Sequence, residues 1–324
     1  MPEGHSVRRL ANTFEEFFVG ERLEVTSPQG RFAAGAAILN GRVMTGVFSY
    51  GKHLFMRFDD LWLHTHLGLY GAWRFHADED VAIEESIGAP RIDSGVLPPL
   101  VDEPEVQGEV GDGPSGDTDS LDAEDEQAVH LEEASWDAPD PVGAVRVRLE
   151  APHVAADLSG PIICEVLDTG RVEQVLDKLG PDPLDHQTDP DLLRKEFVKR
   201  VRASKRAVGD LVMDQAVSAG VGNIYRAEAL FRQGISPNRK GANVSEERLG
   251  RLWDDFVELL EVGVETGDIL TLTDEDAPAE EDAEDAPKHY VYRREGESCL
   301  RCGNPIRHKE MSGRNLYWCS TCQK

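Results

Sequence analysis

The sequence predicts an α+β protein of several domains: an N-terminal β-sandwich with a leading helix, a central helical bundle and a C-terminal zinc-finger β-hairpin. Short β-rich runs broken by turn residues fill residues 21–75, whereas helical periodicity prevails from about residue 181. Four cysteines in two Cys-x-x-Cys pairs stand near the end of the sequence. With 324 residues and 40% hydrophobic content, the chain can hold two or three domains with real cores.

The N-terminal part is predicted to form one helix followed by a β meander or sandwich. Residues 6–19 carry apolar side chains at three- and four-residue steps, namely Val7, Leu10, Ala11, Phe14, Phe17 and Phe18, and Gly20 can end this helix. The predicted strands are residues 23–26, 43–50, 53–58, 61–66 and 71–75. Asp59-Asp60 is predicted as a hairpin turn between two of them.

Two acidic stretches account for the net charge of −27. Residues 78–141 contain 21 acidic residues and one arginine, and residues 265–287 contain ten acidic residues and no basic one. The rest of the chain has a net charge of +3, so the charge does not exclude a nucleic-acid partner. We expect residues 93–140 to be disordered. The acidic stretches either mimic DNA or are solvated loops.

Strand-like sequence returns after the first acidic stretch, at residues 142–149 and 162–166. That stretch is therefore predicted to be a loop inside one β domain. Later in the chain, Pro190 begins one predicted helix, and residues 208–219 form a second. A third, residues 224–231, follows Gly220-Val221-Gly222-Asn223, and Ser245 caps a fourth that is expected to end at Gly263. No 18-residue apolar run and no apolar N-terminal signal are present, so neither a membrane span nor export is indicated.

The cysteine pattern is the strongest chemical signal. Cys299-x-x-Cys302 and Cys319-x-x-Cys322 can each offer two thiolates, and the sixteen residues between the pairs suffice for one β-hairpin. We expect one structural zinc ion per chain, which supplies much of the folding energy of this segment. The basic residues between the pairs suit the binding of phosphates; they are Arg307, His308, Lys309 and Arg314. The alternative is that the zinc site only holds the C-terminal segment together.

The fifth cysteine and two strand histidines are interpreted as structural. Cys164 lies in an apolar run, which is typical of a buried small hydrophobe, and a reducing cytoplasm fits this cysteine usage. His64 and His66 alternate along a predicted strand, and strand histidines are more often structural than ligands.

Gly220-Val221-Gly222-Asn223 is a candidate phosphate site. Glycine allows backbone to approach a ligand closely, and the N-terminus of the following helix offers free N–H groups and a partial positive charge. A simple turn between two helices is the alternative, because a lone Gly-x-Gly is a weak motif.

The start of the chain, Met1-Pro2-Glu3, offers a possible nucleophile. Removal of Met1 would leave a secondary amine on Pro2, and an α-amino group titrates far below lysine. A neutral amine can attack a sugar C1′ and form an iminium, with the Glu3 carboxyl as general acid or base. The alternative is that this start has no function.

These residues together resemble the formamidopyrimidine-DNA glycosylase / endonuclease VIII family of base-excision repair enzymes, and its endonuclease VIII branch in particular. The resemblance covers nearly the whole chain except the acidic stretches. The matching segments are Pro2-Glu3-Gly4, Ser49-Tyr50-Gly51-Lys52-His53-Leu54, His66-Leu67-Gly68-Leu69-Tyr70-Gly71, Leu179-Gly180-Pro181-Asp182-Pro183-Leu184, Met213 through Glu228, and Val291 through Cys299.

The resemblance implies catalytic roles for four residues. Pro2 would be the nucleophile that forms the Schiff base with C1′, and Glu3 would be the acid/base. Lys52 would contact the phosphate near the lesion and help as a proton donor. Arg314 would clamp the phosphates that flank the flipped nucleotide.

Four further residues would bind DNA if the resemblance holds. Gly222 and Asn223 would bind a backbone phosphate. Leu69 and Tyr70 would fill the gap left by base flipping, as a wedge that offsets the cost of unstacking. The alternative for Leu69 is a core residue of a strand.

The family implies a domain division and a function. Residues 1–180 would be the catalytic β-sandwich, 181–264 a helix–two-turn–helix domain, 265–287 an acidic linker and 288–324 the zinc finger. The expected enzyme is a DNA glycosylase and abasic-site lyase that removes oxidised pyrimidines, using a Schiff base followed by β/δ-elimination. Its expected partner is damaged double-stranded DNA, and the chain is expected to be a cytoplasmic monomer.

Three departures from the family pattern concern the substrate. Gly68 replaces the glutamine often found in the endonuclease VIII wedge, so the resemblance does not imply how the opposite base is read. Residues 150–180 contain no Arg-Arg-Phe triplet of the formamidopyrimidine branch, and the acidic stretch 272–287 falls where that branch keeps a loop that covers 8-oxoguanine. These last two departures argue against 8-oxoguanine opposite cytosine as the main substrate. The alternatives are a catalytically idle binder of abasic sites, an 8-oxoguanine/formamidopyrimidine glycosylase, and a zinc-ribbon protein that binds RNA or protein.

Overall fold

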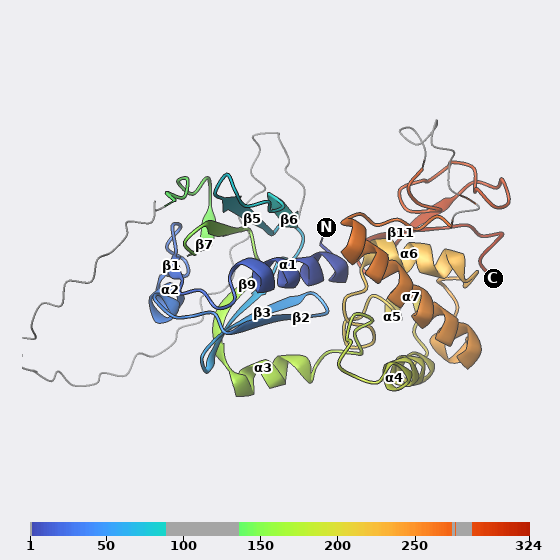
Figure 1. The fold of residues 1–324 in the computed structure, drawn as a ribbon. Helices are drawn as coiled ribbons and strands as arrows, with labels where there is room; N and C mark the ends of the chain where they lie inside the picture. The colour runs from blue at the N-terminus through green and yellow to red at the C-terminus, as the bar shows by residue number, and fades with distance from the viewer. Residues whose placement is uncertain (1, 89–135, 274–275, 277–286) are drawn as a thin grey trace, which may run out of the picture. The chain divides into compact units, whose positions relative to one another are not determined.

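The computed structural model describes residues 2–88, 136–273, 276 and 287–324. The predicted disordered segment 93–140 lies outside the described residues except for its last five, and most of the predicted linker 265–287 lies outside them too. Figure 1 shows the described elements in chain order.

The chain begins with α1 (Gly4–Phe17), close to the predicted helix. Its buried face comprises Val7, Leu10, Ala11 and Phe14, which pack into the core of the sandwich. The helix begins two residues earlier than predicted because the backbone carbonyl of Glu3 accepts hydrogen bonds from Ser6 and Val7. It is followed by β1 (Glu24–Thr26) and by a short helix, α2 (Ala33–Leu39), which was not predicted.

Two antiparallel sheets form the sandwich (Figure 1). The four-stranded sheet has the order β2-β3-β4-β9, with β2 (Gly46–Tyr50), β3 (His53–Phe58), β4 (Leu61–His66) and β9 (Ile163–Asp168). The five-stranded sheet has the order β1-β7-β8-β5-β6, with β5 (Ala72–Ala77), β6 (Ser86–Gly88), β7 (Val145–Glu150) and β8 (Val154–Ser159).

Strands on either side of the first acidic stretch belong to the same sheets. β5 pairs with β8, and β4 pairs with β9, so the stretch interrupts one β domain as predicted. Residues from both sheets and α1 share one core, which includes Phe14, Leu63, Trp73 and Leu158. The turn at Asp59-Asp60 is confirmed, and Asp59 takes a positive φ of 56°.

The strand β8 was not predicted, because Asp157 interrupts its apolar pattern. This aspartate is 2% exposed and lies 3.4 Å from the Arg148 guanidinium and 3.3 Å from His76. The helix α3 (Thr169–Leu176) was also missed; the Asp168 side chain caps it by accepting from the Arg171 N–H at 2.8 Å.

The central part is helical, with α4 (Pro190–Arg202), α5 (Val208–Leu211), α6 (Asn223–Arg232), the short 3₁₀ helix η1 (Gly241–Asn243) and α7 (Glu246–Thr266). The predicted helix over 208–219 was too long. The side chains of Asp214 and Gln215 accept from the backbone N–H groups of Ala216 and Gly220, and such bonds compete with the helical ladder.

The prediction that the last helix ends at Gly263 was wrong. It continues to Thr266 and ends at Gly267, whose φ of 78° is the left-handed conformation typical of helix C-termini. Gly263 lies within this helix at a position where only glycine fits, since a Cβ there would lie 2.3 Å from the Tyr225 hydroxyl and 2.9 Å from the His5 ring. The glycine thus allows α1, α6 and α7 to pack closely.

The C-terminal hairpin consists of β10 (Arg307–Met311) and β11 (Arg314–Trp318). Its small core is shared with α6, because Ala227 and Phe231 pack against Tyr290, Val291 and Ile306. The described residues contain no helix that is long and apolar enough to cross a membrane.

Truncation of Phe14 is expected to test the sandwich core. Phe14 is fully buried and contacts the rings of Phe18, Trp73 and Phe75. Phe14→Ala should lower the free energy of unfolding by about 3–5 kcal/mol, measured by urea denaturation. Phe17→Ala, on the half-buried side of the same helix, should have a clearly smaller effect; equal effects would contradict the burial described here.

Candidate active site and nucleic-acid interface

The carboxylate of Glu3 lies at the N-terminus of α6. Its Oε2 accepts from the Gly222 N–H at 3.1 Å, and its Oε1 accepts from the Ile224 N–H at 2.9 Å. These are backbone donors that the first turn of a helix leaves free, and the helix dipole favours a negative charge there. Glu3 is fully buried, and Pro2 before it is buried as well.

Gly222 makes this contact possible. A Cβ at Gly222 would lie 2.2 Å from the Cδ of Glu3, a distance too short for two non-bonded atoms. Only glycine therefore fits at this position. The structure therefore brings together the predicted catalytic start of the chain and the predicted phosphate loop.

Lys52 reaches the same loop from the turn between β2 and β3. Its Nζ donates to the Val221 carbonyl at 3.0 Å. Burial lowers the pKa of Lys52, with the attraction of Glu3 acting against this shift. Burial also raises the pKa of Glu3, opposed by Lys52 and by the N–H groups of Ile224 and Tyr225. The raised pKa of Glu3 and the lowered pKa of Lys52 both move toward neutral pH, where a group that exchanges protons in acid/base chemistry works best.

Asp182 and Gln215 position this site, and sequence reasoning did not single them out. Asp182 accepts from the Gly51 N–H at 2.7 Å, directly before Lys52, and is 2% exposed. Gln215 donates to the Val221 carbonyl at 3.0 Å and accepts from the Gly220 N–H at 3.0 Å. Both lie within motifs that match the family, but the motif alone does not reveal contacts between distant segments.

Asn223 and Arg314 lie where the hairpin β10–β11 meets α6. The Asn223 amide donates to the Asn315 carbonyl at 3.0 Å, and its oxygen accepts from Arg226. Arg314 is half-buried, and its charge contributes to lowering the pKa of Lys52. Its guanidinium makes no hydrogen bond with any other described residue and is therefore free to meet an anion.

Leu69 and Tyr70 lie in a turn after β4, not in a strand. The Gly71 N–H donates to the Leu67 carbonyl at 2.9 Å, which closes the turn. Leu69 is half-buried, and Tyr70 is 62% exposed, so neither belongs to the sandwich core. An exposed tyrosine in a surface turn is compatible with the predicted wedge.

The strand histidines form a polar chain instead of a metal site. His53 Nδ1 and His64 Nε2 are 2.9 Å apart, and His64 Nδ1 lies 2.9 Å from the Glu165 carboxylate. Burial lowers the pKa of His53 to about 3 and that of His66 to about 4. These imidazoles are therefore neutral at pH 7, in agreement with the structural interpretation.

The four cysteines of the C-terminal pairs come together. The sulfurs of Cys299, Cys302, Cys319 and Cys322 all lie within 4.8 Å of one another, the one such group of potential metal ligands among the described residues. Four thiols at this spacing suit a tetrahedral zinc ion. Cys164 lies apart in β9, where burial raises the pKa of its thiol to about 12, as expected for an inert cysteine.

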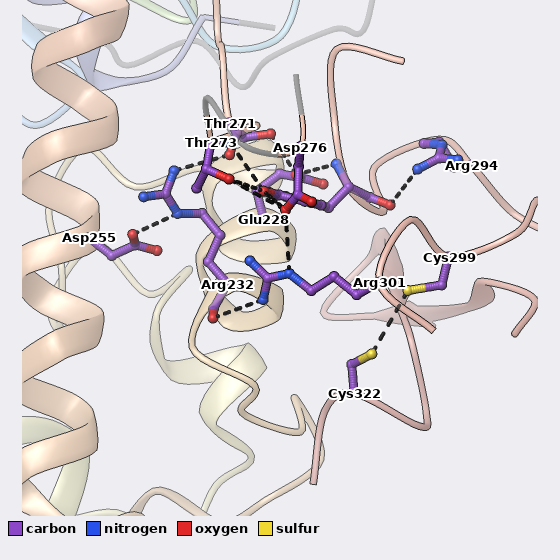
Figure 2. A network of polar contacts seen from close by, with 11 residues as sticks. Glu228, Arg232, Asp255, Thr271, Thr273, Asp276, Arg294, Cys299, Arg301 and Cys322 are labelled. Carbon is purple, nitrogen blue, oxygen red and sulfur yellow. Dashed lines mark hydrogen bonds and ion pairs between the residues drawn. The ribbon is translucent and has the colours of Figure 1, made fainter. Parts of the chain in front are cut away.

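A buried polar network joins this finger to α6 (Figure 2). Glu228 accepts from the N–H groups of Tyr290, Val291 and Tyr292 at 2.7–2.8 Å, and from the Thr271 hydroxyl at 2.6 Å. The described start of the predicted acidic linker is therefore fixed to the helical domain through Thr271.

Arg301 adds a second connection in the same region (Figure 2). Its guanidinium lies 4.9 Å from the Phe231 ring centroid and 4.8 Å from that of Tyr290. Arg301 lies between Cys299 and Cys302, so the loop that carries these two cysteines itself contacts α6. The described part of the finger therefore packs directly against α6.

Comparisons with known proteins agree with this geometry. The formamidopyrimidine-DNA glycosylase N-terminal domain matches residues 1–94, the H2TH domain of the same enzyme matches residues 179–274, and the zinc finger found in FPG and IleRS matches residues 296–324. Endonuclease 8 1 of Mycobacterium tuberculosis is 37% identical over 325 residues, covering 100% of both chains. The chain belongs to the formamidopyrimidine-DNA glycosylase / endonuclease VIII family.

Other relatives are similar over part of the chain or in fold. Formamidopyrimidine-DNA glycosylase of Stenotrophomonas maltophilia is 40% identical over 160 residues, which is 48% of this chain and 56% of the relative. The structure of Lactococcus lactis Fpg with DNA containing N7-benzyl-Fapy-dG has a TM-score of 0.67 at 20% identity and covers 100% of both chains. The predicted α+β architecture is confirmed by this fold.

The family also confirms the predicted class of enzyme, because its members are DNA glycosylases with abasic-site lyase activity. The zinc-finger match and the cysteine cluster are compatible with zinc binding. The roles of individual site residues stay predictions.

For this family member, Gly222→Ala should displace Glu3. We expect the single-turnover rate of cleavage to fall by about 100-fold, because the new Cβ would occupy the position of the Glu3 carboxyl. Gly46→Ala is the matched control, since nothing lies within 4 Å of its Cβ position. If both variants cleave at the wild-type rate, the close contact between Glu3 and α6 is not needed for catalysis.

Cys302→Ser should remove the expected zinc ion and weaken DNA binding by roughly tenfold or more, because the phosphate contacts predicted for the hairpin would be lost. Zinc content can be measured by atomic absorption and affinity by titration with duplex DNA. Helical circular dichroism should be largely retained, because α7 and α4 pack in a separate core. Cys164→Ser is the control and should keep its zinc; full zinc content in Cys302→Ser would contradict the predicted site.

Proposed function

We propose that this chain is a bifunctional DNA glycosylase and abasic-site lyase of base-excision repair that removes oxidised pyrimidines from damaged double-stranded DNA. The observation that carries the proposal is the buried carboxylate of Glu3, held beside Lys52 and the N-terminus of α6, with Pro2 directly before it. This is a sheltered acid/base pair next to a nitrogen that becomes a terminal amine once Met1 is removed, the arrangement that Schiff-base chemistry needs.

In the proposed reaction, the Pro2 amine exposed by removal of Met1 attacks C1′ of the damaged nucleotide. The bond from C1′ to the base breaks, and the base leaves with its electron pair and takes up a proton. Lys52 is the proposed donor of that proton. The Pro2 nitrogen loses its proton, and the C1′–O4′ bond breaks as Glu3 gives a proton to O4′, which leaves an iminium between Pro2 and C1′. The iminium acts as an electron sink: loss of a C2′ proton expels the 3′-phosphate in β-elimination, and loss of a C4′ proton then expels the 5′-phosphate in δ-elimination, which cleaves the strand.

The proposed DNA contacts surround this pair. Arg314 and Asn223 would hold phosphates that flank the flipped nucleotide. Gly222 would contribute through its lack of a side chain, because its N–H donates to Glu3. Leu69 and Tyr70 would fill the vacated space in the duplex. Support comes from the similar fold of Lactococcus lactis Fpg, solved in complexes with DNA containing a modified base and with DNA containing an abasic site.

Oxidised pyrimidines are proposed as the substrate for two reasons. The relative that matches the full length is an endonuclease 8, and the chain lacks the Arg-Arg-Phe triplet of the formamidopyrimidine branch. We further propose one structural zinc per chain, action as a monomer, and a cytoplasmic location. A panel of duplexes with defined lesions tests the substrate choice, and faster excision of 8-oxoguanine opposite cytosine would favour the formamidopyrimidine alternative.

The nucleophile can be tested with two chains that differ only in Met1. The chain that begins at Pro2 should form a covalent adduct with abasic-site DNA on borohydride reduction, and peptide mapping should place the adduct on Pro2. The chain that keeps Met1, verified by mass, should form none, because its Pro2 nitrogen is an amide. Pro2→Gly should lose trapping and strand cleavage while keeping DNA affinity within a few fold.

Two results would overturn the proposal. Full lyase activity in the chain that keeps Met1 would exclude Pro2 as the nucleophile. Tight binding of abasic-site DNA without any adduct from the chain that begins at Pro2 would instead identify a catalytically idle binder.

A further inference from the structure

The start of α1 packs against the end of α7 through side chains for which two glycines leave room (Figure 1). His5 and Arg9 are four residues apart on α1 and therefore lie on one face of it. Gly263 and Gly267 have the same spacing at the end of α7. A Cβ at Gly263 would lie 2.9 Å from the Cγ atom of His5. A Cβ at Gly267 would lie 2.2 Å from a guanidinium nitrogen of Arg9, so each glycine accommodates one side chain of α1.

The ring of His5 also contacts α6. It lies 5.5 Å from the Tyr225 ring, centroid to centroid, at an interplanar angle of 80°, which is an edge-to-face contact. A Cβ at Gly263 would lie 2.3 Å from the Tyr225 hydroxyl as well, so the three helices meet at this point. His5 is 4% exposed and Tyr225 is fully buried. The imidazole is therefore enclosed at the junction of α1, α6 and α7.

The Pro2 nitrogen depends on the residues after it for its position. In the proposed reaction this nitrogen attacks C1′, so it must stay free of hydrogen bonds that would hold it. The Glu3 carboxylate accepts from the Ile224 N–H at 2.9 Å. The Gly4 N–H donates to the Gly220 carbonyl at 2.9 Å. Both contacts are made around the start of α6, and neither fixes the tilt of α1 against α7.

His5, the next residue along the chain, supplies a contact with α7. Burial, assisted by the charge of Arg9, lowers the pKa of His5 to about 4, so its ring is neutral at pH 7. A neutral ring can hold the start of α1 in place without adding a positive charge near the iminium that Pro2 would form.

We propose that His5 is a positioning residue: its ring, held between Tyr225 and α7 at Gly263, sets the direction from which the Pro2 nitrogen meets C1′. This inference rests on the proposed function and concerns a residue that neither the motifs nor the family resemblance singled out. His5 acts through Glu3 and Gly4, which connect it to Pro2. Loss of the ring therefore slows the attack and leaves the affinity for DNA unchanged, because no proposed DNA contact involves His5.

The first experiment separates attack from binding. In the chain that begins at Pro2, at saturating abasic-site duplex, His5→Ala should trap with borohydride roughly 10- to 100-fold more slowly, because a small misplacement of a reacting group costs up to that factor. The dissociation constant for a duplex with a tetrahydrofuran abasic analogue should not change. His5→Phe, which keeps a ring against Tyr225, should recover most of the trapping rate.

Phe14→Ala is the matched control, because Phe14 is buried on the same helix but packs into the sandwich core. It should lower the thermal unfolding temperature at least as much as His5→Ala does. At a temperature where both variants are folded, Phe14→Ala should nevertheless trap at the wild-type rate. His5→Ala should lower the rate by the same factor at every pH, because the substitution changes the position of Pro2 and removes no proton-transfer group.

A third measurement does not depend on catalysis. The Gly4 N–H should exchange with solvent hydrogen faster in His5→Ala than in the wild type, because its contact with Gly220 is no longer supported. The acceleration should exceed that of the amides of β3 in the same chain, which report the stability of the sandwich.

The inference is overturned if His5→Ala traps abasic-site DNA no more slowly than Phe14→Ala. A changed pH optimum in His5→Ala would also overturn it, because His5 would then be a proton-transfer group. If the wild type forms no borohydride adduct, the proposed function fails, whereas exchange of the Gly4 N–H still decides whether His5 holds the start of the chain.

Discussion

One buried residue, Glu3, determines where the other site residues lie. Its backbone carbonyl accepts the first hydrogen bonds of α1, and its carboxylate accepts N–H groups at the start of α6, 219 residues later in the chain. A buried carboxylate is stable only where donors or opposite charge compensate its lost hydration. Here the helix N-terminus and Lys52 provide both, so the sandwich and the helical bundle are joined through the same carboxylate that is the proposed acid/base.

The contact between Glu3 and the start of α6 restricts which residues can surround it. Gly222 must lack a side chain because Glu3 fills the space, and Gly220, with a φ of +84°, lies against Gly4 and Gly51. The Gly-x-Gly segment is thus explained by the close approach of three backbones. The interpretation as a turn between two helices is confirmed by α5 and α6 on either side, whereas phosphate binding at this segment stays a prediction.

Local signals predicted much of the fold, whereas long-range contacts were hidden. The strands 53–58 and 61–66 were predicted to the residue because their alternation and turn are local, while β8 was missed because buried Asp157 depends on Arg148 in another strand. The cysteine site followed from spacing alone. Asp182 could not be found in this way, since it binds Gly51 in a distant segment. The contacts of Gln215 are local, but they matter to the site only because Lys52 from a distant turn donates to the same Val221 carbonyl.

The helix α6 connects the two ends of the site. Its first turn holds Glu3, and one turn further Glu228 is fully buried and bound to three N–H groups of the segment that leads into the zinc finger. Removing those donors would leave an uncompensated buried charge, so the finger segment and the helix are expected to be ordered together. Because Arg314 lies on the finger hairpin, its distance from Lys52 depends on α6. The cysteine cluster would therefore influence the proposed catalysis through this helix.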